Sequence, residues 1–166
     1  MILYILRHGL AEETSATGDD GSRKLTARGR EKMHDAAVRM RTHGLKFDAI
    51  LSSPLTRAAE TAELVSEAYA GTIAPQVLPE LGTGVSPAEV VAALKPFARM
   101  KNVMIVGHEP QLSGLAALLI TGTNDGARIE LKKGAVIALD LPARAERGGA
   151  KLLWLLTSRQ LRKLRK

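Results

Sequence analysis

Short apolar runs alternate with segments of helical periodicity along the chain. Short, predominantly apolar runs, typical of strands buried on both faces, occur at 2–6, 47–53 and 102–107. Each is followed along the chain by a segment whose apolar residues recur at helical spacing. This alternation predicts an α/β fold, a three-layer sandwich in which a mostly parallel central sheet has helices on both faces.

Sequence signals at helix ends support these assignments. Thr26 is a candidate N-cap and Gly44 a C-terminal stop for the first helix. Ser86, Pro87 and Glu89 form the pattern of a capping box with proline at the first helical position. Helices are therefore expected within 26–44, 86–100 and 110–122, with a further helix beginning at Pro54 to Thr56.

Two other regions lack helical periodicity. Residues 11–24 are polar and predict an exposed loop. The last third of the chain, with apolar segments in 127–141 and 149–156, predicts strands joined by turns. Such strands are compatible with an antiparallel edge on the otherwise parallel sheet.

Composition narrows the class of protein. The chain of 166 residues is 45% hydrophobic and 25% charged, which is typical of a single globular domain. Because cysteine is absent, disulfides, thiolate nucleophiles and thiolate metal sites are excluded. No apolar run approaches the ~20 residues that span a bilayer, and Arg7 interrupts the N-terminal run. We therefore expect a soluble, cytoplasmic protein without membrane contact.

The positive charge is concentrated at the C-terminus. Residues 159–166 carry five of the positive charges and no acid, so the rest of the chain has a net charge of only +2. We expect a single domain over 1–158 and a basic tail over 159–166. This tail is either a solvated, frayed end or a contact for an acidic partner. Nucleic acid is disfavoured as a partner because only 3% of the residues are aromatic.

Polar residues with catalytic potential occur where the predicted strands end. His8 ends the first strand, Arg57 lies at the start of the helix after the second, and His108 ends the third. Ligands of open α/β sheets bind outside the carboxyl ends of the strands, so these side chains should meet there. Together with Arg7 they suit a phosphoryl group, whose oxygens match guanidinium groups. Phosphate or sulfate is the ligand expected in this pocket.

The candidate nucleophile is His8. Cysteine, a Gly-x-Ser-x-Gly elbow and a nucleotide-binding P-loop are all absent from the sequence. Imidazole attacks phosphorus only when neutral, and its ordinary pKa of ~6.5 leaves most of it neutral at cellular pH. Neighbouring arginines should lower that pKa further.

A metal site is the alternative interpretation of two converging histidines. Glu12, Glu13 and Glu109 lie near them in sequence and could complete a ligand set. However, no His-x-x-x-His or Asp-x-His pattern is present, and a cation would share the pocket with Arg7 and Arg57. We therefore expect neither a metal nor another cofactor.

Four motifs resemble a known family. "RHG" ends the first strand, "LTARG" begins the first helix, "SSPLTRAAETA" follows the second strand and "VGH" ends the third. In this order and spacing they resemble the histidine phosphatase superfamily. The short chain and the "VLPEL" segment are similar to the SixA-type phosphohistidine phosphatases. The resemblance implies a phosphoglycerate mutase-like fold and a histidine phosphatase domain over 1–158.

The resemblance also implies residue roles. His8 would be the nucleophile that becomes phosphorylated, and Arg7, Arg57 and His108 would form the rest of the phosphate pocket. Arg23 matches an arginine of the SixA type and would be a further phosphate or substrate contact.

The general acid is implied less directly. Glu80 in "LPEL" is the closest match to the acid of larger members, and Glu12 and Glu13 are the other candidates. A surface acid at a turn is the alternative interpretation of Glu80. A phosphohistidine substrate makes less demand on such an acid, because imidazole leaves more easily than an alkoxide.

The predicted function is thus a metal-independent phosphatase that forms a phosphohistidine enzyme intermediate. Only 50 residues separate Arg57 from His108, which leaves little room for an insertion that caps small substrates. This favours phosphohistidine in a phosphorylated protein as the substrate. Two alternatives stay open: a broad phosphatase of small phosphoesters such as sugar phosphates and nucleotides, and a non-catalytic phosphate-binding module.

Overall fold

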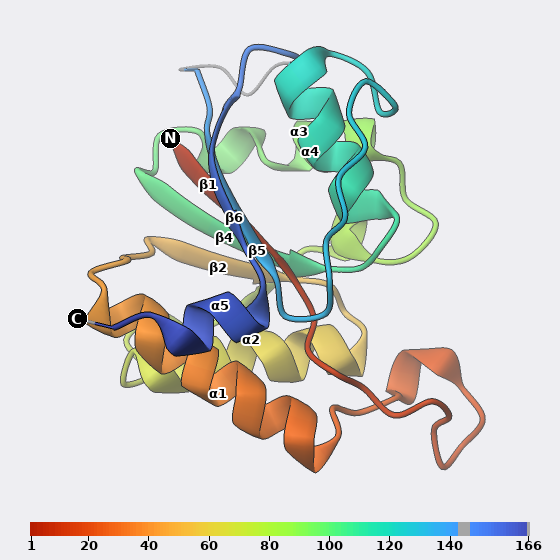
Figure 1. Ribbon diagram of the computed structural model, residues 1–166. Coiled ribbons are helices and arrows are strands. Elements are labelled where there is room, and N and C mark those ends of the chain that lie inside the picture. Colours follow the sequence, from red (N-terminus) through yellow and green to blue (C-terminus); the bar gives the residue numbers. More distant parts are fainter. Residues whose placement is uncertain (143–146, 166) are drawn as a thin grey trace.

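A six-stranded mixed sheet forms the centre of the computed structural model, which describes residues 1–142 and 147–165 (Figure 1). Its strands are β1 (Ile2–Arg7), β2 (Ala49–Ser52), β3 (Gln76–Val77), β4 (Asn102–Gly107), β5 (Val136–Asp140) and β6 (Lys151–Leu156). They lie in the order β3-β2-β4-β1-β5-β6. The first four run parallel, whereas β5 pairs antiparallel with both β1 and β6. The prediction of a mostly parallel sheet with an antiparallel edge is confirmed.

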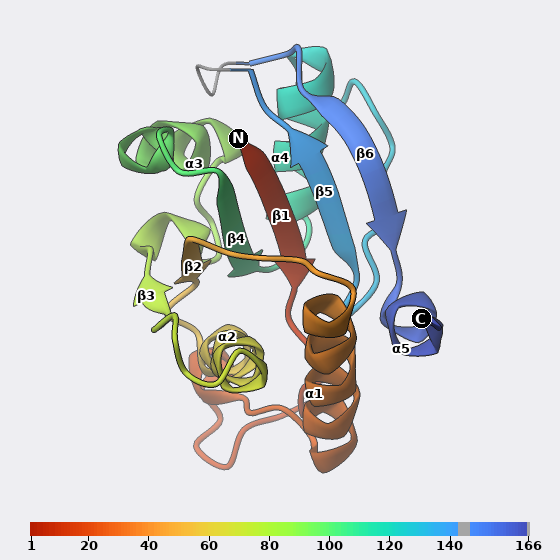
Figure 2. The same cartoon turned by 90° about the vertical axis from the view of Figure 1, so that its left-hand side faces the viewer.

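Helices cover both faces of this sheet (Figure 2). The α-helices are α1 (Ala27–Thr42), α2 (Thr56–Ala68), α3 (Pro87–Ala93), α4 (Gln111–Thr121) and α5 (Ser158–Lys163). Short 3₁₀ helices are η1 (Asp20–Ser22), η2 (Pro79–Leu81) and η3 (Lys95–Phe97). One apolar core lies between the sheet and α3 and α4, and a second lies between the sheet and α1, α2 and α5. The three layers expected from the sequence are therefore present.

The packing of strand β1 explains why its sequence is continuously apolar. Leu3 and Ile5 pack into the core beneath α3 and α4, while Tyr4 and Leu6 pack into the core beneath α1, α2 and α5. All four are buried, and β1 lies between β4 and β5. A strand with a core on each face needs apolar residues at every position, so the run is continuous instead of alternating.

The helix-end signals are confirmed. Thr26 Oγ1 accepts a hydrogen bond from the Gly29 amide at 3.0 Å, and Ser86 forms the expected capping box with Glu89. Helix α1 ends at Thr42, and Gly44 follows with a φ of 79°, a value that favours glycine.

The strand expected at the start of 127–141 is wrong for residues 127–135, which form a loop before β5. This loop is fixed at the end of β1, because the Gly134 amide donates to the carbonyl oxygens of both Arg7 and His8 at 3.1 Å. Its apolar Leu131 is buried without being part of a strand. Residues 11–24 are largely exposed, as predicted, and contain η1.

Of the two interpretations of the basic tail, a frayed end is wrong for residues 159–163, which lie in α5. A capping box joins Thr157 and Gln160, and Leu161 is buried in the core against α1. The buried Leu161 stabilises α5 as a short amphipathic helix. The backbone that carries these basic residues therefore has a fixed position. Lys166 lies outside the described residues.

Within residues 1–142 and 147–165, none of the helices combines the length and apolar character that a membrane crossing requires.

Candidate active site

The two histidines expected to meet lie at the ends of neighbouring strands. His8 follows β1 and His108 follows β4, and these parallel strands pair in a register that sets Arg7 opposite Gly107. The imidazole rings have centroids 5.0 Å apart and are tilted by 51°. Both side chains are buried, with exposed fractions of 6% for His8 and 4% for His108. Residues 100 positions apart in sequence therefore form one site.

A backbone carbonyl fixes the orientation of the His8 ring. Its Nδ1 lies 2.7 Å from the Gly9 carbonyl oxygen. A carbonyl oxygen only accepts, so Nδ1 carries the proton in the neutral ring. The lone pair is then on Nε2, which is the nitrogen available for attack on phosphorus.

The surroundings of His8 keep its imidazole neutral. The pKa of His8 is lowered to about 4, mainly by burial; the Gly9 hydrogen bond opposes this shift, and the charges of Arg57, Arg7 and Lys133 add to it. The direction expected from the neighbouring arginines is confirmed. The main cause, however, is removal from water, which disfavours the charged ring.

His108 is oriented by a hydroxyl group. Its Nε2 lies 2.8 Å from Ser53 Oγ, which also accepts a hydrogen bond from the Leu55 amide at 3.2 Å. The Ser53 hydroxyl can donate its proton to Nε2, and in that tautomer Nδ1 carries the ring proton. In the part of the chain that the structure describes, Nδ1 is buried without a hydrogen-bond partner. In this tautomer it is a donor for an anion in the site.

Burial, followed by the neighbouring His8 and Arg57, lowers the pKa of His108 to about 3. His108 is thus a neutral ring, which donates from Nδ1 when Ser53 donates to Nε2. The sequence assigned no role to Ser53, although it lies within the quoted "SSP" motif.

Arg57 is the second residue of α2, and its side chain is 3% exposed. Its guanidinium donates to the Asp20 carbonyl oxygen at 2.7 Å and to Asp20 Oδ2 at 3.0 Å. Arg23 pairs with the other oxygen of the same carboxylate at 2.7 Å. These two arginines, predicted as phosphate contacts, therefore converge on one anionic group. The sequence did not indicate Asp20, because it lies in a loop without periodicity.

Arg7 lies at the end of β1 and is half-buried. Its Nη1 donates to the Leu131 carbonyl oxygen at 2.9 Å, which holds the guanidinium beside the loop before β5. Its charge reaches both histidines, since it lowers the pKa of each.

The contact that brings Glu80 towards the two histidines is made by its backbone carbonyl and not by its carboxylate. Gln111, three residues after His108, donates to the carbonyl oxygens of Glu80, Gly82 and Val85. These bonds anchor η2 beside the start of α4. Among the described residues, no hydrogen bond joins the Glu80 carboxylate to His8 or His108.

Two of the three acids considered for a metal site, Glu12 and Glu109, have other partners. Glu12 Oε2 accepts from the Lys24 amide at 3.3 Å, and Glu109 Oε1 accepts from the Ser113 amide at 2.9 Å. Over residues 1–142 and 147–165, no three acidic or histidine side chains cluster in a way that could hold a metal ion.

The two lowered histidine pKa values predict how stability depends on pH. The folded pKa of His8 is about 4 and that of His108 about 3, against 6.5 for a free imidazole. Below pH ~6.5 the unfolded chain therefore binds more protons than the folded chain, so the free energy of unfolding falls as the pH falls towards 4. His8 alone should contribute a loss of about 3 kcal/mol over this range.

Urea unfolding between about pH 7 and pH 5 measures this slope. His8→Asn should flatten it, whereas the same substitution of the exposed His34 should not. Equal slopes for His8→Asn and the wild type would contradict the assignment.

Comparisons with known proteins agree with this geometry. Residues 3–82 match the model of the histidine phosphatase superfamily (branch 1). An uncharacterised protein of Picosynechococcus is 36% identical over 95% of this chain and 96% of its own length. The phosphohistidine phosphatase SixA of Escherichia coli is 29% identical over 74% of this chain and 76% of its own length.

Similarity in structure extends over nearly the whole chain. The structure of the protein histidine phosphatase SixA complexed with tungstate has a TM-score of 0.85 at 24% identity and covers 97% of this chain and 99% of that one. The fold is thus phosphoglycerate mutase-like, as the sequence motifs implied. With a buried histidine pair after β1 and β4 and the family's motifs around it, the chain belongs to the histidine phosphatase superfamily, and SixA-type phosphatases are among its relatives.

Proposed function

We propose that this protein is a metal-independent phosphatase that transfers a phosphoryl group from a phosphorylated protein histidine to His8 and then to water. The observation that carries the proposal is the state of His8. Its ring is neutral, its Nδ1 is hydrogen-bonded to the Gly9 carbonyl oxygen, which leaves the lone pair on Nε2, and the ring lies beside His108 within reach of the charges of Arg57 and Arg7. A binding module would need the arginines but not an activated nucleophile beside them.

The proposed first step forms a phosphoenzyme. The phosphoryl oxygens bind to the guanidinium groups of Arg57, Arg7 and Arg23 and to the Nδ1 proton of His108. Nε2 of His8 attacks phosphorus, and the bond from phosphorus to the leaving nitrogen or oxygen breaks with its electron pair on the leaving atom. In the second step water attacks the phosphohistidine, releases inorganic phosphate and restores neutral His8.

The Asp20 carboxylate competes with the phosphoryl group for Arg57 and Arg23. Its carboxylate holds Arg57 and Arg23 at the nitrogen atoms that a phosphoryl group would take. Substrate binding therefore involves displacement of one anion by another, with the loop around η1 moving as it occurs.

Glu80 is the proposed proton donor to the leaving atom. Its place beside the start of α4 supports this role, since η2 is anchored there by Gln111. An imidazole leaving group is itself a weak enough base to leave with little assistance, whereas an alkoxide needs a proton. A phosphohistidine substrate therefore depends less on Glu80 than a phosphoester does.

The absence of a large cap supports a protein substrate. Between α2 and β4 the chain forms only β3, η2, α3 and η3, none longer than seven residues. The relative from Escherichia coli is named a phosphohistidine phosphatase, which agrees with this substrate class.

A substrate panel tests the proposal. Phosphate release is measured, with a chelator present, from a phosphohistidine-containing phosphotransfer protein, sugar phosphates, nucleotides and p-nitrophenyl phosphate. We expect the highest kcat/KM for the phosphohistidine protein. A higher value for a sugar phosphate or nucleotide would assign the enzyme to small phosphoesters, and binding without any release would assign a phosphate-binding module.

A further inference from the structure

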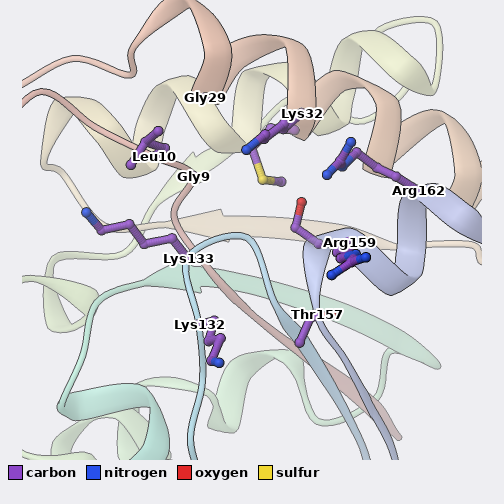
Figure 3. Close-up of a pocket in the computed structure, with 11 residues that line it drawn as sticks. Gly9, Leu10, Gly29, Lys32, Lys132, Lys133, Thr157, Arg159 and Arg162 are labelled. Carbon is purple, nitrogen blue, oxygen red and sulfur yellow. The ribbon is translucent and has the colours of Figure 1, made fainter.

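Five cations line a hollow that Figure 3 shows beside Gly9 and Leu10. It has a volume of about 260 Å³, and its lining includes Gly9 and Leu10, which directly follow His8. The cations are Lys32, Lys132, Lys133, Arg159 and Arg162. Its lining contains no acidic residue. We refer to it as the basic pocket.

Three distant segments of the chain build the basic pocket. Lys32 comes from α1, Lys132 and Lys133 from the loop before β5, and Arg159 and Arg162 from α5 (Figure 3). Each segment is fixed in place. The loop is hydrogen-bonded to β1 through Gly134, and α5 is held against α1 by the buried Leu161. The positive charges therefore gather as a result of tertiary structure, not as a solvated tail.

The pocket is electrostatically connected to the reaction site. Lys133 is among the charges that lower the pKa of His8. The Gly134 amide, next in the chain, donates to the His8 carbonyl oxygen at 3.1 Å. An anionic group bound in the pocket would thus lie beside a phosphoryl group bound at His8.

Four of the five pocket cations form no ion pair with another residue that the structure describes. Among the described residues, the one ion pair formed by these cations joins Lys132 to Glu130 at 3.5 Å, and both of its side chains are well exposed. In the same part of the chain, Ser158 Oγ and Arg162 Nε are buried atoms without hydrogen-bond partners. Unpaired donors and like charges that crowd together are costly unless an anion binds between them.

We propose that the basic pocket binds glutamate or aspartate side chains of the phosphorylated protein, next to its phosphohistidine. This inference rests on the proposed function and adds the recognition element to it. The occupant is an acidic protein segment because the exposed side chain of Leu10 adds apolar surface beside the cations, which suits the stems of acidic side chains. Complementary charge of this kind steers the partner and sets its orientation.

Direct binding tests the pocket independently of turnover. The probe is a fluorescent, unphosphorylated peptide rich in glutamate, measured by anisotropy with inorganic phosphate present to fill the catalytic site. Lys132→Glu combined with Arg159→Glu should weaken binding about tenfold or more, since two attractive charges become repulsive. Both side chains are exposed, so the fold should tolerate the change.

The matched control is Lys95→Glu combined with Lys101→Glu, which makes the same change of charge at exposed positions beyond the pocket lining. This control should bind the peptide like the wild type. Both double variants should hydrolyse p-nitrophenyl phosphate at the wild-type rate. The proposal would be overturned if a matched peptide with glutamine in place of glutamate bound as tightly as the acidic peptide. It would also be overturned if the control variant weakened binding as much as the pocket variant does. Binding of tripolyphosphate without binding of the peptide would overturn it in favour of a small-anion site.

Turnover separates this inference from the proposed function. The wild type should hydrolyse a phosphohistidine peptide with glutamate flanks faster than one with glutamine flanks, and the Lys132→Glu, Arg159→Glu variant should lose that preference. If the acidic peptide binds at the pocket but neither phosphopeptide is hydrolysed, the proposed substrate is wrong while the pocket stands. If both are hydrolysed equally and the acidic peptide does not bind, the pocket proposal fails and the proposed function stands.

Discussion

His8→Asn is expected to lower phosphate release from every substrate by roughly 10⁴-fold or more, because it removes the atom that forms the covalent intermediate. Asparagine is similar in size to the ring and can still donate to the Gly9 carbonyl oxygen, so the local hydrogen bond is retained. The measurement is phosphate release from p-nitrophenyl phosphate, together with trapping of labelled phosphoenzyme after rapid quenching.

His34→Asn is the matched control, since His34 is exposed on α1 away from the site. It should retain wild-type activity and form the labelled intermediate. Labelled phosphoenzyme in His8→Asn, or activity close to that of the wild type, would show that another residue is the nucleophile.

The second large effect is expected for Arg57. Arg57→Met should lower kcat/KM by roughly 10²- to 10³-fold, because the phosphoryl charge loses a preorganised donor that is screened from water. The side chain is 3% exposed, and methionine fills much of its volume, so the fold should persist. The measurement is steady-state hydrolysis alongside thermal unfolding.

Arg57→Lys separates charge from geometry. Lysine keeps the positive charge but not the paired donors, so its activity should lie between those of the wild type and Arg57→Met. Arg28→Met, at an exposed position in the first turn of α1, is the control and should be fully active. An Arg57→Met enzyme that is as active as this control would remove Arg57 from the phosphate site.

Much of the fold could be predicted because its signals are local. The continuous apolar run of β1 indicated two buried faces, and both cores contact it. Thr26 and Ser86 marked helix starts through hydrogen bonds made within four residues. The loop at 127–135 was not predicted, because Leu131 is buried by neighbours far away in sequence instead of by a strand partner.

The meeting of His8, Arg57 and His108 could be predicted from topology. Parallel strands bring their carboxyl ends to one edge, so residues at the ends of β1, β2 and β4 had to lie close together. Roles that depend on individual atoms could not be inferred in this way. Nδ1 of His8 donates to the Gly9 carbonyl oxygen, and Nε2 of His108 is hydrogen-bonded to Ser53. Neither contact has a signal in the sequence.

The sequence by itself determined the alternation of strands and helices, the ends of α1 and α3, and the residue types brought to the ligand edge. Periodicity and capping act over a few residues and can be read directly. Only the tertiary structure decided that burial more than charge lowers the pKa of His8, that Asp20 holds Arg57 and Arg23, and that the basic C-terminal residues join α1 in one pocket. Desolvation and charge clustering depend on distances between residues far apart in sequence, and those distances are set only when the chain folds.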